Sequence, residues 1–174
     1  MVELISEKHQ GVIQTFECHE VIDRFLRNDA LPWMKEGLTR PWLFVHRGRI
    51  VGYLTLSTNV IFLDQKERDG LAITTKRTEW PAVLIGMLGV DKDYRGGGRR
   101  LGDYLLQYAV GQAQLIAEIA GAKFIVADVY NDPYALAMYE RNGFQRSIYK
   151  DYQGKPRIKY WRALTSNPSV DQVG

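Results

Sequence analysis

The clearest hydrophobic pattern lies in the middle of the chain. Residues 83–90 are almost continuously apolar, which is typical of a strand covered on both faces. From Leu101 to Ile119 apolar side chains recur at three- and four-residue intervals, which predicts a helix of about five turns that ends at Gly121. Residues 124–130 are again mostly apolar, with Asp128 as the exception, and with Lys123 they form the next predicted strand. This order predicts a strand, a crossover helix and a parallel strand in a right-handed unit.

The first half of the chain carries patterns of both kinds. Residues 16–31 have an apolar stripe at helical spacing, which predicts an amphipathic helix that stops before Pro32. Two β-rich runs, 42–45 and 50–56, flank a four-residue loop with a glycine and predict a hairpin. Residues 64–81 are charged and lack periodicity, so we expect a loop there.

Composition predicts an ordinary globular protein. At 174 residues, 45% hydrophobic and 25% charged, the chain predicts one domain over 1–165 and a disordered tail over 166–174. It contains no run long enough for a transmembrane helix, and its first residues lack the pattern of a secretion signal. We therefore expect a soluble, cytoplasmic protein without a membrane partner.

Cysteine and histidine offer little chemistry. The single cysteine, Cys18, excludes an internal disulfide, and the scattered histidines predict no metal site. A nucleophilic thiol would need a partner base that the sequence does not indicate. The alternative is that Cys18 is a small buried hydrophobe.

A basic, glycine-rich turn follows the central strand. Backbone N–H groups in a glycine turn at the start of a helix form an anion site, and arginines beside it add charge-assisted donors. Arg95, Arg99 and Arg100 flank the three glycines 96–98. The turn predicts a pyrophosphate site, and the alternative is a surface turn with solvated arginines.

Two motifs around this turn resemble the GNAT superfamily of acyl-CoA-dependent N-acyltransferases. The first is Tyr94-Arg95-Gly96-Gly97-Gly98, directly after the central strand. The second has the spacing Asn-x-x-x-Ala-x-x-x-Tyr-Glu-x-x-Gly-Phe and is met by Asn131, Ala135, Tyr139, Glu140, Gly143 and Phe144. Arg100 stands where the first motif should end in Gly or Ala. This departure suggests an Arg99-Arg100 insertion, with Gly102 in the role of the last glycine.

The resemblance implies a fold and an enzyme class. The fold is α/β (α+β), with a mixed, mostly antiparallel sheet, a splayed central parallel strand pair and flanking helices. The activity is N-acetyl transfer from acetyl-CoA, used as cosubstrate without a metal, to a primary amine. In this fold residues 64–81 border the acceptor cleft, and the unusual length of that segment suggests a role in substrate binding.

The resemblance also assigns roles to individual residues. Pantetheine lies along the central strand, where a backbone N–H polarises the thioester carbonyl. Tyr139 protonates the departing sulfur, since a phenol stays protonated at neutral pH; the alternative is a packed core aromatic. Asn131 bonds pantetheine or caps its helix. No base is assigned: Glu79, Asp128 and a water relay stay open. The expected cofactor-binding residues are Leu88, Gly89, Val90, Arg95, Gly96, Gly97, Gly98, Arg99, Arg100, Gly102, Asn131 and Ala135.

The acceptor stays open between a small amine, a protein amine and an aminoacyl-tRNA. Residues 16–18, Phe-Glu-Cys, resemble the toxin branch of the superfamily, which acetylates charged tRNA. Residues 145–164 have the alternating pattern of side chains that predicts two strands. They belong to a basic, tyrosine-rich stretch, which either contacts RNA or is a solvated face. The formal net charge of +3 is modest for a polyanion binder. The basic residues of this stretch are Arg141, Arg146, Lys150, Lys155, Arg157, Lys159 and Arg162.

A non-catalytic acyl-CoA sensor is the alternative function from a different class of protein. Candidate partners are tRNA and a second copy of the chain, which would form a homodimer.

Overall fold

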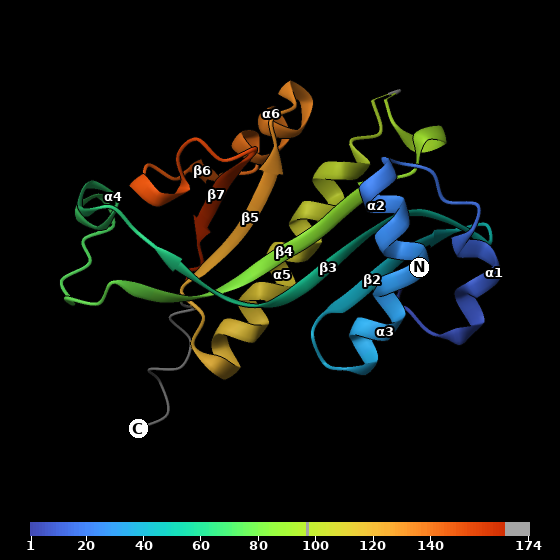
Figure 1. The fold of residues 1–174 in the computed structure, drawn as a ribbon, viewed down its shortest axis with the longest axis horizontal. Coiled ribbons are helices and arrows are strands. Elements are labelled where there is room, and N and C mark those ends of the chain that lie inside the picture. Colours follow the sequence, from blue (N-terminus) through green and yellow to red (C-terminus); the bar gives the residue numbers. More distant parts are fainter. Residues whose placement is uncertain (97, 166–174) are drawn as a thin grey trace. The chain divides into compact units, whose positions relative to one another are not determined.

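The computed structural model describes residues 1–96 and 98–165 (Figure 1). Gly97 and the expected tail 166–174 lie outside the described residues. No described helix is long and apolar enough to cross a membrane. The strands are β1 (Val2–Leu4), β2 (Arg40–His46), β3 (Arg49–Phe62), β4 (Glu79–Val90), β5 (Phe124–Tyr130), β6 (Gln145–Arg146) and β7 (Arg157–Ala163). The α-helices are α1 (Gln10–Ile13), α2 (Glu20–Arg24), α3 (Ala30–Lys35), α4 (Gln65–Gly70), α5 (Leu101–Ala120) and α6 (Pro133–Arg141).

The strands follow the order β1-β2-β3-β4-β5-β7-β6. The pairs β1–β2, β2–β3, β5–β7 and β6–β7 are antiparallel, and β4 and β5 are parallel neighbours. The predicted mixed, mostly antiparallel sheet with a central parallel pair is therefore confirmed. The predicted strand, crossover helix and strand are β4, α5 and β5, and Gly121 follows α5 with a positive φ of 77°.

The chain divides into two compact units. The first comprises residues 1–57 and 85–109, and the second comprises 58–84 and the described residues from 110 on. The boundaries fall within β3, β4 and α5, so each of these elements contributes residues to both units. That residues 1–165 form a single domain stays a prediction.

In the first unit, helices cover the sheet through apolar contacts. Phe25 and Leu26 belong to one buried cluster with Leu43 of β2 and Tyr53 of β3. The buried Tyr53 hydroxyl donates a 2.6 Å hydrogen bond to the carbonyl oxygen of Ile22 in α2. This bond and the apolar cluster fix α2 on β3.

The helix expected over 16–31 is only partly correct. Its helical part begins at Glu20 and continues through a π-helical turn, Phe25–Asp29, into α3, so that Pro32 lies inside a helix. A proline ring normally clashes with the carbonyl four residues earlier. Here the Ala30 N–H donates to Phe25 O, five residues back, so the wider turn interrupts the regular bonding just before the proline.

The predicted hairpin is confirmed as β2 and β3, with a shorter loop than expected. Strand pairing continues to His46 and Arg49, which leaves Arg47 and Gly48 as the loop. Both have positive φ, at 48° and 76°, as type I′ hairpin turns require.

In the second unit, the segment expected as a loop over 64–81 contains helix α4. Asp64 caps it by accepting from the Lys66 N–H at 3.0 Å, and Glu67 accepts from the Asp64 N–H at 2.7 Å. The other Glu67 oxygen accepts from the Trp161 indole N–H at 2.8 Å and from the Ile148 N–H at 3.0 Å. Tertiary bonds to this buried carboxylate therefore hold a helix that hydrophobic periodicity does not indicate.

Candidate functional site

The predicted phosphate turn lies in the first unit, between β4 and α5. Gly96, Gly98 and Arg100 have positive φ values of 72°, 74° and 46° and are exposed. The amides of Arg95 and Arg99 donate within the turn, to Lys92 O at 3.4 Å and to Gly96 O at 3.3 Å. Those two amides are thus committed to shaping the turn. The helix-start N–H groups that we expect to bind an anion therefore belong to the beginning of α5.

Gly102 and the arginines have different surroundings. Gly102 is the second residue of α5 and half-buried. The Arg95 guanidinium donates from Nε to Val90 O at 2.9 Å and from a terminal nitrogen to Cys18 Sγ at 2.7 Å. The Arg99 guanidinium lies over the Tyr94 ring, 5.9 Å from its centroid. All three arginines are exposed, but the Arg95 guanidinium is bonded to the end of β4 and to Cys18.

A buried carboxylate ties this turn to the loop before α2. Asp91 is 1% exposed and accepts from the Glu17 N–H at 3.1 Å and the Asp93 N–H at 3.1 Å. The Lys92 N–H donates to Glu17 O at 2.7 Å, and Arg49 lies 3.8 Å from Asp91. The start of the turn and residues 16–18 are therefore held as one structure. Sequence analysis missed Asp91, although an Asp that starts a turn after a strand is a recognisable signal.

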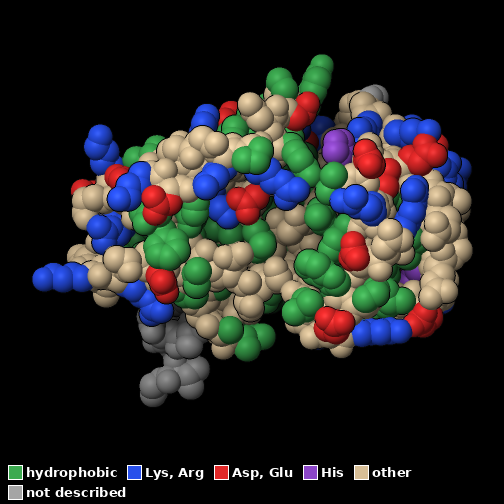
Figure 2. All heavy atoms as spheres, viewed as in Figure 1, with side chains coloured by type: hydrophobic (Ala, Val, Ile, Leu, Met, Phe, Trp, Pro, Cys, Tyr) green, Lys and Arg blue, Asp and Glu red, His purple; other side chains and the backbone are tan. Residues whose placement is uncertain are grey.

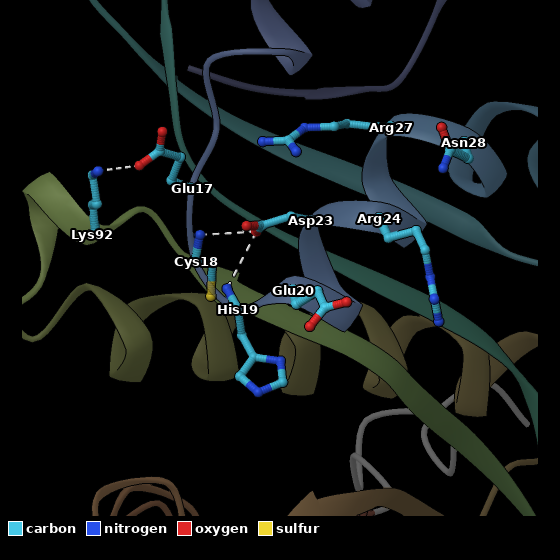
Figure 3. A pocket seen from close by; sticks show the side chains of 9 residues that line it. All are labelled: Glu17, Cys18, His19, Glu20, Asp23, Arg24, Arg27, Asn28 and Lys92. Carbon is cyan, nitrogen blue, oxygen red and sulfur yellow. Dashed lines mark hydrogen bonds and ion pairs between the residues drawn. The ribbon is translucent and has the colours of Figure 1, made fainter.

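Beside this junction lies a cavity of about 590 Å³ (Figure 3). Figure 3 shows the Asp23 carboxylate reaching back to the backbone of Cys18 and His19, at 2.8 and 3.3 Å. Lys92 pairs with Glu17 at the other end of the cavity. Hydrogen bonds and ion pairs therefore already orient part of the polar lining of this cavity. Its lining residues are Glu17, Cys18, His19, Glu20, Asp23, Arg24, Arg27, Asn28 and Lys92.

Cys18 lies between this cavity and β4. A Cβ atom at Gly89 would be only 3.1 Å from Cys18 Sγ and 2.8 Å from Ile22 Cγ2, so glycine lets the loop and α2 approach the strand. Burial raises the pKa of the Cys18 thiol, although the Arg95 guanidinium acts in the opposite direction. A protonated thiol is a poor nucleophile, so the structure favours a packing role for Cys18.

Tyr139 lies in the second unit, on α6. Asp132 caps this helix by accepting from the Ala135 N–H at 2.9 Å, and Pro133 is its first residue. The cap is thus Asp132 and not Asn131, which is exposed just before it, whereas Ala135 is half-buried. Cofactor binding by Asn131 and Ala135 stays a prediction.

The Tyr139 side chain is 6% exposed and packs edge-on against the Phe144 ring, with centroids 5.1 Å apart. Burial raises the pKa of its phenol, and the negative charge of Asp128 adds to this effect. The hydroxyl therefore keeps its proton over the neutral range, as a general acid must before it donates. Packing and acid chemistry are compatible at this residue.

The candidate bases have different surroundings in the second unit. Glu79 is exposed at the first position of β4. Asp128 accepts from Lys159 Nζ at 2.8 Å, so its carboxylate already has a cationic partner. Neither residue is singled out as the base.

The basic stretch of the second unit is only partly available to a polyanion. Arg157 lies over the Tyr130 ring at 4.5 Å, Lys159 pairs with Asp128, and Arg162 donates to Asn142 O at 2.8 Å. The exposed members are Arg141, Arg146, Lys150 and Lys155. On the face drawn in Figure 2, basic and acidic side chains are interspersed. No group of His, Cys, Asp or Glu among the described residues could hold a metal ion.

A family comparison decides the enzyme class. Residues 7–144 match the model of the acetyltransferase (GNAT) family. The chain belongs to this GNAT family. The prediction of an acyl-CoA-dependent N-acetyltransferase with acetyl-CoA as cosubstrate is thereby confirmed.

Individual relatives of this acetyltransferase are bacterial toxins. A tRNA-acetylating toxin of Mycobacterium tuberculosis is 28% identical over 126 residues, which cover 72% of this chain and 73% of the toxin. A crystal structure of a bacterial toxin has a TM-score of 0.75 at 21% identity, covering 94% of this chain and 91% of that one. AtaT complexed with acetyl-methionyl-tRNAfMet has a TM-score of 0.75 at 17% identity, with 92% of both chains covered. These structures share the fold of this acetyltransferase.

Proposed function

We propose that this acetyltransferase transfers the acetyl group of acetyl-CoA to the α-amine of an aminoacyl-tRNA. The observation that carries the proposal is the similarity to the tRNA-acetylating toxin over 72% of the chain. The Phe16-Glu17-Cys18 segment supports it, because this segment resembles the toxin branch of the superfamily. Asp91 and Arg95 hold the segment beside the end of β4, where the thioester is expected. The proposal thus selects one acceptor from the three that the sequence leaves open.

The chain's own residues supply the rest of the chemistry. The start of α5 and the glycine turn bind the diphosphate of the cofactor through backbone N–H groups, with Arg99 and Arg100 as exposed cationic partners. The amine nitrogen attacks the thioester carbonyl carbon, and the C–S bond breaks. Tyr139 donates its proton to the departing thiolate and regains one from solvent.

An α-amine acceptor does not require a strong general base. An α-amine has a reference pKa of about 7.7 to 8.0, well below the 10.4 of a lysine side chain. A substantial fraction is therefore uncharged at neutral pH, and its proton can leave to water after attack. An acceptor of this kind places little demand on Glu79 or Asp128.

The proposal is tested with acetyl-CoA radiolabelled in the acetyl group. The protein is incubated with aminoacylated tRNA, with the same tRNA after mild alkaline deacylation, and with an amine-bearing peptide. We expect label only on the aminoacylated tRNA, because deacylated tRNA has lost the α-amine. Label on the peptide alone would overturn the proposed acceptor, and acetyl-CoA binding without transfer to any acceptor would favour the sensor.

A further inference from the structure

One backbone amide of β4 donates a hydrogen bond to a side chain of the neighbouring strand. The Met87 N–H donates to Oγ1 of Thr55 in β3, at 2.9 Å. Thr55 is 2% exposed, so this bond is shielded from water. The Thr55 hydroxyl is therefore a buried acceptor for a main-chain N–H group of β4.

The neighbouring glycine makes room for this hydroxyl. A Cβ atom at Gly86 would lie 2.9 Å from Thr55 Oγ1, closer than real Cβ contacts allow. Glycine at 86 and threonine at 55 are therefore complementary. A larger residue at 86 would displace the hydroxyl from the Met87 amide.

Two further contacts show which way the end of β4 faces. The carbonyl oxygen of Gly89 lies 3.0 Å from where a Cβ of Gly52 would be, and the Asp91 N–H donates to Val51 O at 3.0 Å. Gly52 and Val51 belong to β3. Together with Met87, these residues show that the odd-numbered positions direct their main-chain groups toward β3.

Because main-chain groups alternate along a strand, the even-numbered positions face the opposite edge of β4. Val90 agrees with this alternation, because its carbonyl oxygen accepts from Arg95 Nε at 2.9 Å. By the same alternation the Leu88 N–H points to the edge opposite β3. Leu88 is one of the residues predicted to flank the thioester.

We propose that Thr55 is a positioning residue for acetyl transfer. By holding the Met87 amide toward β3, it directs the Leu88 N–H to the opposite edge of β4, where that N–H donates to the thioester carbonyl oxygen. Negative charge gathers on this oxygen when the amine attacks. An electron pair on the oxygen then re-forms the carbonyl double bond, and the C–S bond breaks with the charge on the departing coenzyme A thiolate. The inference rests on acetyl-CoA as donor and is independent of which amine accepts.

The test compares Thr55→Val, which is isosteric but lacks the acceptor, with Thr55→Ser, which keeps it. The control is Thr39→Val, since Thr39 is also buried and its hydroxyl donates to Leu56 O of β3 at 3.0 Å. Infrared spectra of bound acetyl-CoA, labelled with carbon-13 at the carbonyl, report the polarisation of that bond without an acceptor. Turnover and the Kd for acetyl-CoA are measured alongside.

For Thr55→Val we expect kcat to fall about 10- to 100-fold, because a misplaced oxyanion donor costs this much or more. The Kd for acetyl-CoA should change little, and the carbonyl band should return toward its position in free acetyl-CoA. Thr55→Ser should restore kcat and band, and Thr39→Val should leave both as in the wild type.

The inference would be overturned if the carbonyl band of folded Thr55→Val stayed at its wild-type position. Equal losses of kcat in Thr55→Val and Thr39→Val would overturn it too. If Thr55→Val does not fold, Gly86→Ala decides, because its methyl group displaces the hydroxyl. The same band shift there supports the inference, and an unchanged band contradicts it. Because the spectrum needs no tRNA, failure of the proposed acceptor would leave this result intact.

Discussion

Asp91 should contribute more to stability than any exposed charge near it. Its buried carboxylate accepts two backbone N–H bonds, each 3.1 Å long, from Glu17 and Asp93. Asp91→Asn keeps one acceptor oxygen and turns an amide N–H toward the second donor. A hydrogen bond to a charged group contributes about 1.5 to 3 kcal/mol, so the free energy of unfolding should fall by about that amount.

Urea denaturation followed by far-UV circular dichroism measures this loss. The matched control is Asp93→Asn, two residues along, where a half-exposed carboxylate pairs with Arg49 at 2.8 Å. Such surface pairs contribute about 0 to 1 kcal/mol. We also expect a higher Kd for acetyl-CoA in Asp91→Asn, because the start of the turn loses its anchor. Equal stability of the wild type and Asp91→Asn, or equal losses in both variants, would refute this reasoning.

Three further predictions concern the pH dependence of stability and two glycines. The pKa of Tyr139 is raised in the folded state. The stability that its protonated phenol contributes to the fold is therefore fully present below pH about 10 and is lost as pH rises above that value. We compare the free energy of unfolding of the wild type with that of Tyr139→Phe. The difference between them should shrink by up to about 1.4 kcal/mol per pH unit between pH about 10 and 11. A difference that stays constant over this range would contradict the prediction. Gly111 lies inside α5, and apart from the nearby helix backbone and its chain neighbours nothing lies within 4 Å of the position that a Cβ would take there. Gly111→Ala should therefore stabilise by about 0.5 to 1 kcal/mol in urea denaturation. Gly89→Ala should lower the free energy of unfolding by about 1 to 3 kcal/mol, because its methyl group would overlap Ile22. Unchanged stability would show that α2 can move away from the strand without destabilising the protein.

Elements whose signal is local were predictable. Strand β4, helix α5 and strand β5 each carry their own periodicity, and Gly121 marks the end of the helix. Helix α4 was missed because its apolar spacing is weak, although the Asp64-x-x-Glu67 capping box was readable. The continuation of the helix through Pro32 was not readable, since it depends on a π-helical turn.

In the candidate site, too, the local features were predictable and the long-range contacts were not. The positions of the glycine turn and of Tyr139 on α6 follow from short motifs with fixed spacing. The contacts that hold the site join residues far apart in sequence: Glu17 and Asp91 are 74 positions apart, and Cys18 and Arg95 are 77 apart. Even Thr55 and Met87 are separated by 32 positions. Such partners depend on strand register, which a single sequence does not reveal.

The central claim is that the glycine turn binds the cofactor while Tyr139 acts in the chemical step. It is tested most directly by measuring kcat and the Kd for acetyl-CoA in Tyr139→Phe and in Gly98→Ala, with Tyr134→Phe as control, because Tyr134 lies on the same helix and is 87% exposed. Tyr139→Phe should lower kcat about 100-fold or more with an unchanged Kd. Gly98→Ala, which forces a side chain into a positive-φ position at a cost of about 1 to 2 kcal/mol, should chiefly raise the Kd. Equal loss of kcat and affinity in Tyr139→Phe would contradict the account and make Tyr139 a packing residue.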